Sequence, residues 1–267
     1  MAFLIWKGPS LFDGAPIVVL ASSRPSTNRK TGDLIQTYIL REDIHPQEAV
    51  ASNQDTSICG TCRFRGDHGK KRKCYVNLRY GPYSVWWAYR RGNAPQIDLR
   101  EFARRKVVRI GAYGDPAAVP TEVWLNLLSE AAGHTGYTHA WRTCDPRLKS
   151  IVQASCDHPE DYREAKAAGW HTFRVRLPDE PRMLGERPCP AAAEVKNDVT
   201  CADCMGCNGQ RRDFVVTAHG TAGQVAEYRK FRLTRCATSP AVQGGERIAR
   251  TAPDEVEDEQ IDETVFQ

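Results

Sequence analysis

Seven of the ten cysteines form two groups whose spacing suits metal binding. The first cluster is Cys59, Cys62 and Cys74, and the second cluster is Cys189, Cys201, Cys204 and Cys207. Thiolate is a soft, strongly donating ligand, so closely spaced cysteines suit a zinc ion or an iron–sulfur cluster. Spacing alone does not choose between these cofactors, and both remain candidates.

The second cluster contains a Cys-x2-Cys-x2-Cys run, which a tight loop can wrap around one centre. We expect a structural metal site or an auxiliary cluster there, within the loop over residues 189–207. The alternative is a set of buried thiols that hold no metal.

The first cluster has a Cys-x2-Cys-x11-Cys arrangement in a loop rich in Gly and Lys, residues 59–74. Three protein ligands and a vacant fourth position are typical of a catalytic metal, because substrate or cofactor must occupy the vacancy. His68 lies between these cysteines and would close the site as a fourth ligand, which would make it a structural zinc site. Both interpretations are compatible with the spacing.

A glycine-rich acidic turn follows the strand predicted over residues 106–110. It reads Gly111-Ala-Tyr-Gly114-Asp115-Pro116. Glycines at the carboxyl end of a strand let a ligand approach the backbone, and a carboxylate there can hold an amino-bearing group. Asp115 is therefore the leading candidate for an active-site acid. An N-cap or turn aspartate is the alternative interpretation.

The segment from Leu99 to Leu177 alternates between helix and strand signals. Helices are predicted over Leu99–Arg105, Thr121–Ala132 and Pro159–Ala168, and strands over Lys106–Ile110, Thr138–Arg142, Ser150–Ala154 and Thr172–Leu177. Such alternation predicts parallel β/α units, which place functional loops at the carboxyl ends of the strands. We expect an α/β fold, a full or partial parallel β/α barrel with Cys-rich metal-binding loops. His139, on one of these strands, is a candidate catalytic residue.

The domain organisation follows from composition. Residues 1–238 are expected to form a single β/α domain with metal-binding insertions at 59–74 and 189–207, and residues 239–267 a disordered acidic tail. Residues 241–267 carry eight acidic and two basic side chains, which leaves a net charge of +10 on the rest of the chain.

Basic runs are interleaved with tyrosines and tryptophans between residues 63 and 106. This pattern permits contact with DNA or RNA through stacking and charge, and the alternative is a core of Trp86 and Trp87 under a cationic surface. The sequence has neither a signal peptide pattern nor an apolar run of the roughly 20 residues that span a membrane. We expect a cytoplasmic protein without a membrane partner, in which reduced thiols favour metal over disulfides. Oligomeric state is not indicated.

The order of these motifs resembles that of radical S-adenosylmethionine enzymes and of phage-encoded gene product 88-like proteins. The likeness rests on three cysteines with Tyr75 beside the last, then a strand ending Gly-x-x-Gly-Asp-Pro, then β/α units and a later Cys-rich segment. It implies that the first cluster holds a four-iron cluster, that Tyr75, Gly111, Gly114 and Asp115 contact S-adenosylmethionine, and that the second cluster is auxiliary. It also implies the cytosol of a bacterial or phage-infected cell. The cysteine spacing departs from the Cys-x3-Cys-x2-Cys of those enzymes.

A second resemblance is to tRNA-guanine transglycosylases, which are zinc-bearing barrels that exchange a base. It rests on the same glycine-rich acidic turn, on the segment Asp157–Gly169 and on the later cysteines with His219. The likeness implies that Asp115 and Asp157 recognise the base and attack, and that His219 completes a structural zinc site.

Three function classes follow from the sequence. The preferred one is a metal-dependent enzyme of the iron–sulfur, radical type that acts on a nucleotide or nucleic-acid component. The second is a zinc-containing base-exchange enzyme acting on DNA or tRNA. The third is a non-catalytic module, stapled by zinc, that binds nucleic acid or protein.

Overall fold

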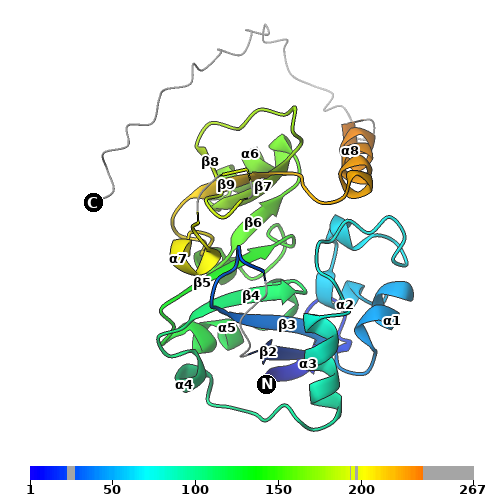
Figure 1. The fold of residues 1–267 in the computed structure, drawn as a ribbon, viewed down its shortest axis with the longest axis vertical. Coiled ribbons are helices and arrows are strands. Elements are labelled where there is room, and N and C mark those ends of the chain that lie inside the picture. The colour runs from blue at the N-terminus through cyan, green and yellow to red at the C-terminus, as the bar shows by residue number, and fades with distance from the viewer. Residues whose placement is uncertain (23–27, 193, 196–197, 237–267) are drawn as a thin grey trace, which may run out of the picture.

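Nine strands form one open sheet in the computed structural model, which describes residues 1–22, 28–192, 194–195 and 198–236. The strand order is β1-β2-β3-β4-β5-β6-β7-β9-β8, with antiparallel pairing from β1 to β3 and parallel pairing from β3 onward (Figure 1). The predicted α/β class with a mostly parallel sheet is confirmed. Within the described residues β1 and β8 are the edges of the sheet, so it does not close on itself.

The elements have the following bounds. The strands are β1 Ala2–Pro9, β2 Pro16–Ser22, β3 Ile35–Arg41, β4 Val107–Tyr113, β5 Gly133–Thr138, β6 Gln153–Cys156, β7 Thr172–Arg176, β8 Glu186–Pro188 and β9 Asp213–Thr217. The α-helices are α1 Pro46–Ala51, α2 Thr56–Cys59, α3 Gly81–Arg90, α4 Leu99–Ala103, α5 Thr121–Leu128, α6 Pro159–Ala167, α7 Cys201–Cys204 and α8 Ala222–Cys236. Short 3-10 helices are η1 Arg63–Arg65, η2 Pro116–Ala118 and η3 Pro146–Ser150.

Two predicted strands are displaced along the chain. The strand expected over 138–142 is β5, which ends at Thr138, and the strand expected over 150–154 begins only at Gln153. Pairing with β4 fixes β5, because Val107 lies opposite Gly133 and Ile110 opposite Gly136. The two glycines in β5 obscure its strand signal. As a result His139 lies just beyond the strand, at its carboxyl end.

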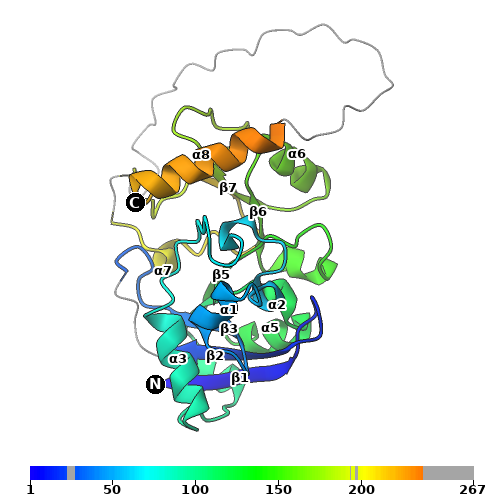
Figure 2. The same ribbon diagram turned by 90° about the vertical axis from the view of Figure 1, so that its right-hand side faces the viewer.

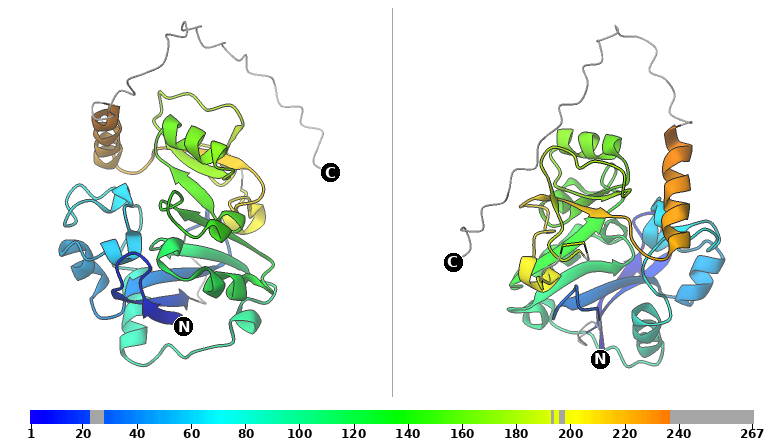
Figure 3. Two further views of the ribbon diagram at one scale, coloured as in Figure 1. Left: turned by 180° about the vertical axis from the view of Figure 1, so that it is seen from behind. Right: turned by 45° about the horizontal axis from the view of Figure 1, so that its top comes forward.

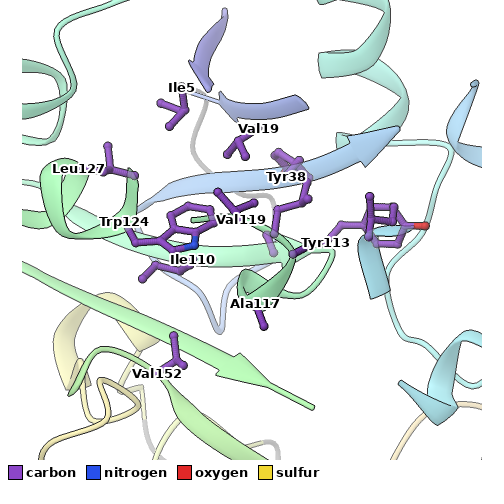
Figure 4. Packing of buried hydrophobic residues seen from close by; sticks show 14 of the residues in the cluster. Ile5, Val19, Tyr38, Ile110, Tyr113, Ala117, Val119, Trp124, Leu127 and Val152 are labelled. Carbon is purple, nitrogen blue, oxygen red and sulfur yellow. The ribbon is translucent and has the colours of Figure 1, made fainter. Parts of the chain in front are cut away.

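The main core lies around β2, β3 and β4. Trp124 of α5 is fully buried against this core, and its indole N–H donates to the carbonyl of Pro116 at 3.0 Å (Figure 4). Trp86 of α3 is also buried, and its N–H donates to the Arg41 carbonyl at 3.0 Å. The structural interpretation of Trp86 is therefore confirmed.

A second hydrophobic cluster lies between the carboxyl ends of the parallel strands and α8. Its buried members are Phe64, Val175, Leu177, Ala192, Val216, Ala218 and Tyr228. The Phe64 and Tyr228 rings stack with centroids 5.6 Å apart, which joins the loop after α2 to α8 (Figures 2 and 3). Cys62 and Cys74 of the first cluster and Cys189 of the second all pack against this group.

The acidic tail predicted over 239–267 lies outside the described residues. Among the described residues, no helix has the length and apolar character that crossing a membrane requires.

A buried ion pair links β7 to the start of β8. Arg174 donates from Nε and Nη2 to Glu186 at 2.6 and 2.7 Å, and neither side chain is exposed to solvent. Removing one partner of such a pair leaves an uncompensated buried charge.

We predict that Glu186→Ala lowers the free energy of unfolding by about 3–5 kcal/mol, measured by urea denaturation. The matched control is Glu160→Ala, because the Glu160–Arg163 pair is exposed on both sides and such pairs contribute less than about 1 kcal/mol. Equal losses in the two variants would contradict this assignment.

Candidate functional site

The candidate site residues predicted from the sequence lie together at the carboxyl ends of the parallel strands. The loop with the first cluster follows β3, Asp115 follows β4, His139 follows β5 and Asp157 follows β6. Because these strands are parallel neighbours, their carboxyl ends meet at that edge. The Asp115 amide donates to the carbonyl of Ile58, the residue before Cys59, at 2.6 Å. Two motifs more than fifty residues apart in the sequence are thus directly hydrogen-bonded.

The thiols of the first cluster lie close enough to influence one another. Burial raises the pKa of the Cys59 thiol, and negative charge on Cys62 and Cys74 raises it further. Burial also raises the pKa of Cys74, an effect that Arg72 partly offsets. Several partly buried thiolates are unfavourable together unless a cation compensates them, so this donor set suits a metal.

The backbone closes the eleven-residue gap of the first cluster. The amides of Lys73 and Cys74 both donate to the Phe64 carbonyl at 2.9 Å, which returns Cys74 to the start of the loop. The Cys62 amide donates to the Cys59 carbonyl at 3.0 Å. Cys74, which is distant from Cys59 and Cys62 in the sequence, is therefore brought back toward them in the folded loop.

His139, rather than His68, is the histidine beside the first cluster. The His68 side chain is 56% exposed at a turn and lies 3.7 Å from Asp67 Oδ1. Burial lowers the pKa of His139, but the charge of Cys62, a hydrogen bond to Cys62 and the charges of Asp157 and Asp115 outweigh it and raise the pKa to about 10. Its Nε2 is buried and has no hydrogen-bond partner. The structure does not bring His68 to the thiols.

Asp115 joins the ends of two strands. Its Oδ1 accepts from Thr138 Oγ1 at 2.7 Å and from the Ala117 amide at 3.0 Å, and its Oδ2 accepts from the His139 amide at 2.7 Å. Asp115 is the N-cap of η2, as the turn interpretation expected. Its carboxylate therefore fixes the position of His139 and retains little capacity for a ligand.

The two glycines of the turn are required by the chain's own packing. Gly111 has φ +65°, and a Cβ there would lie 2.8 Å from the Gly114 carbonyl. Gly114 has φ +84°, and a Cβ there would lie 2.6 Å from Ile39 Cβ. The atoms that a Cβ would contact at these two positions belong to β3 and to the turn itself.

Asp157 and Tyr75 differ in their relation to the first cluster. Asp157 is buried next to His139, which lowers its pKa, although burial dominates and raises that pKa; its Oδ1 has no hydrogen-bond partner. Tyr75 is 46% exposed and stacks on His219 at the end of β9, with ring centroids 5.0 Å apart. Asp157 therefore belongs to the buried site, and Tyr75 belongs to its outer rim.

The second cluster is also assembled around its thiols. Burial raises the pKa of the Cys207 thiol; a hydrogen bond from Tyr137 lowers it, and the charges of Cys189, Cys201 and Cys204 raise it. The Cys201 amide donates to the Lys30 carbonyl at 2.8 Å, and the Gly136 amide donates to the Cys207 carbonyl at 2.9 Å. This segment ties the loop before β3 to β5. His219 contacts Tyr75 and the Thr217 carbonyl rather than these thiols.

The two clusters bring thiols together without the geometry of a finished metal site. The cysteines of both clusters, with Cys144 and Cys156, are free thiols. Across the residues that the structure describes, no group of three or more His, Cys, Asp or Glu side chains has an arrangement that could hold a metal ion. The donor chemistry fits a metal, and metal binding remains a prediction.

Sequence reasoning missed Tyr113 and Arg72. Tyr113 is 3% exposed at the end of β4, and its Oη has no hydrogen-bond partner. Figure 4 shows its side chain pointing away from Trp124, toward the cyan segment that follows β3. Arg72 lies within a basic run that reads as solvated surface. The one available signal was the position of Tyr113 inside the glycine-rich turn.

We predict that Asp115→Ala lowers the free energy of unfolding by roughly 2–4 kcal/mol, because three buried donors lose their acceptor. Urea denaturation measures the loss, and Asp67→Ala, whose side chain is 84% exposed, serves as the control. Unchanged stability in Asp115→Ala would show that the carboxylate has no structural role.

Comparison of the chain with protein-family models, with curated proteins and with solved structures gave no match. The resemblances to radical S-adenosylmethionine enzymes, to gene product 88-like proteins and to transglycosylases therefore stay predictions. The functional assignment depends on the geometry at the carboxyl edge of the sheet.

Proposed function

We propose that this chain is a metal-dependent enzyme whose reaction takes place at the carboxyl ends of the parallel strands. The observation that carries the proposal is the position of the first cluster, whose three interacting thiols lie beside His139 and Asp157 at the ends of adjacent strands. An iron–sulfur cluster of the radical S-adenosylmethionine type is the cofactor that best matches the order of motifs. The substrate class that we favour is a nucleotide or nucleic-acid component.

Partnerless polar atoms support a site for a missing group. Tyr113 Oη, His139 Nε2 and Asp157 Oδ1 are buried without hydrogen bonds. Most buried polar atoms in proteins are satisfied, so several orphans near one set of thiols indicate that a ligand or metal completes them.

The scaffold is suited to such a reaction. Six parallel strands, β3, β4, β5, β6, β7 and β9, follow one another in the sheet, and we infer that they form a partial β/α barrel. The first cluster and the glycine-rich turn follow the first two of these strands, in the order that the radical-enzyme resemblance requires. The stacked rings of Phe64 and Tyr228 belong to the second hydrophobic cluster beside this site and would help to exclude water from it.

Each group would have a distinct task. Cys59, Cys62 and Cys74 would hold the metal, and His139 would stay hydrogen-bonded to Cys62 while Asp115 fixes its backbone. When bound, a reduced iron–sulfur cluster would supply the electron that cleaves S-adenosylmethionine and starts hydrogen abstraction from the substrate. The second cluster would hold an auxiliary or structural metal.

The transglycosylase-like function ranks second. Asp157 favours it, since this carboxylate is buried with a free Oδ1 at the end of β6. Two observations weigh against it, because the Asp115 carboxylate already accepts three hydrogen bonds and His219 contacts Tyr75. A chain that contains zinc and incorporates labelled guanine into DNA or tRNA would reverse this order.

Several arginines of the basic surface already have partners within the chain. Arg65 forms an ion pair with Asp55. Arg90 lies over the ring of Trp86, and Arg91 lies over the ring of Trp87. Tyr80 and Tyr83 remain exposed and can stack on bases.

We predict that the anaerobically purified chain is brown, absorbs broadly in the visible range and contains several irons per chain. Changing Cys59, Cys62 and Cys74 together to Ser should remove the iron held by the first cluster and leave that of the second. Inductively coupled plasma mass spectrometry and visible spectroscopy measure both quantities.

Two controls make this test specific. Cys144→Ser removes a thiol outside both clusters, and His68→Ala removes the exposed histidine; both should keep the full iron content. A colourless protein with two zincs would refute the iron–sulfur assignment and favour the non-catalytic, zinc-stapled module.

A further inference from the structure

Arg72 has a guanidinium edge without a partner beside the first cluster. Its Nη1 donates to the carbonyls of Cys74 and Val76 at 3.2 and 3.1 Å, which fixes the plane of the group. Its Nε and Nη2 atoms are buried and have no hydrogen-bond partner. These two nitrogens form one edge of the guanidinium, and their N–H groups point in the same direction.

In five other arginines of this chain, the same Nε–Nη2 edge binds a carboxylate. In five pairs, Nε and Nη2 of the arginine both donate to one carboxylate: Arg41–Asp43, Arg65–Asp55, Arg142–Glu164, Arg147–Asp145 and Arg174–Glu186. Among the described arginines, Arg72 is the one whose Nε and Nη2 atoms are both buried without a hydrogen-bond acceptor. An unsatisfied buried charged donor is costly, so its presence indicates a ligand.

The loop is shaped to place Arg72. Gly66 has φ +78°, and a Cβ there would lie 3.0 Å from the Arg72 Cα, so only glycine leaves room for this backbone. Lys71 adopts a left-handed φ of +54°, which is unfavourable for a residue with a side chain. The chain accepts this strain directly before Arg72, as is common at binding sites.

Tyr113 supplies a second buried donor near the first cluster. Its hydroxyl is buried without a partner, and it interacts electrostatically with Arg72, Cys59 and Cys74. Asp55 also lies near Arg72, but Arg65 already holds its carboxylate at 2.6 Å. Arg72 is hydrogen-bonded to the Cys74 carbonyl, and Tyr113 points toward the segment that carries the first cluster (Figure 4), so both donors lie beside that cluster.

We propose that Arg72 and Tyr113 form a subsite for a carboxylate group of the ligand that binds beside the first cluster. The Nε–Nη2 edge would hold both carboxylate oxygens, and the Tyr113 hydroxyl would donate to one of them. A monoanionic carboxylate suits this site better than a phosphate dianion, because the same arginine edge binds carboxylates in the five pairs above and the Asp55 carboxylate already lies near this single arginine. The subsite deepens the proposed function, since it rests on a ligand binding at that cluster.

The experiment compares ligands with and without a carboxylate. Isothermal titration calorimetry on the full chain, purified anaerobically, measures the affinity for S-adenosylmethionine and for its decarboxylated form. A second arm measures acetate and inorganic phosphate at constant ionic strength. The variants are Arg72→Lys, which keeps the charge and loses the edge, Tyr113→Phe, and the control Arg79→Gln on the exposed end of the same segment. Circular dichroism verifies that each variant is folded.

We expect the carboxylated nucleoside to bind the unmodified chain and Arg79→Gln with the same affinity. Arg72→Lys, and removal of the carboxylate from the ligand, should each weaken binding roughly 10- to 100-fold, and the two losses should not add. If acetate binds in a way that depends on Arg72 and S-adenosylmethionine does not bind, the result would support the subsite and refute the proposed cofactor. Carboxylate binding that Arg72→Lys leaves unchanged, or tighter binding of phosphate than acetate, would overturn the inference.

Discussion

The packing of three partly buried thiols at the carboxyl ends of the parallel strands is the constraint on which the structure of the site depends. A thiolate in low-dielectric surroundings is unfavourable, and a second and third beside it are more so. Burial raises the pKa of Cys74, an effect that the charge of Arg72 partly offsets, and His139 lies beside Cys62, which raises the pKa of His139. Both cations would stabilise negative sulfur. A bound metal would do the same more strongly, and this is why the first cluster rather than the second determines the proposed activity.

The same residues hold the fold and position the site. Asp115 joins β4 to β5 through Thr138 and fixes the backbone of His139, so the chemistry at the end of β5 depends on a structural carboxylate. The Phe64 ring lies in the loop of the first cluster and stacks on α8, and it also contacts His139 with ring centroids 5.7 Å apart. Loss of packing in this second hydrophobic cluster would therefore disturb the site as well as the stability of the chain.

The sequence predicted what depends on local pattern. Strand and helix alternation predicted the parallel sheet, and residue type with spacing predicted which cysteines lie together. The choice of His139 over His68 was not accessible, because it depends on a left-handed turn that turns His68 outward and on pairing between β4 and β5 that ends β5 at Thr138. Arg72 could not be distinguished from its basic neighbours, since the direction of its guanidinium is set by two carbonyls of the folded loop. The sequence left Asp115 as either an active-site acid or a turn aspartate. The three hydrogen bonds that its carboxylate accepts in the structure favour the turn interpretation.

The most direct test of the central claim is the position of metal in a crystal of the anaerobically prepared chain, located by anomalous scattering at the iron edge. We expect a strong iron peak within bonding distance of the sulfurs of Cys59, Cys62 and Cys74, with His139 against Cys62 and His68 in solvent. No anomalous peak at these sulfurs, or a zinc ion there whose fourth ligand is His68, would contradict it.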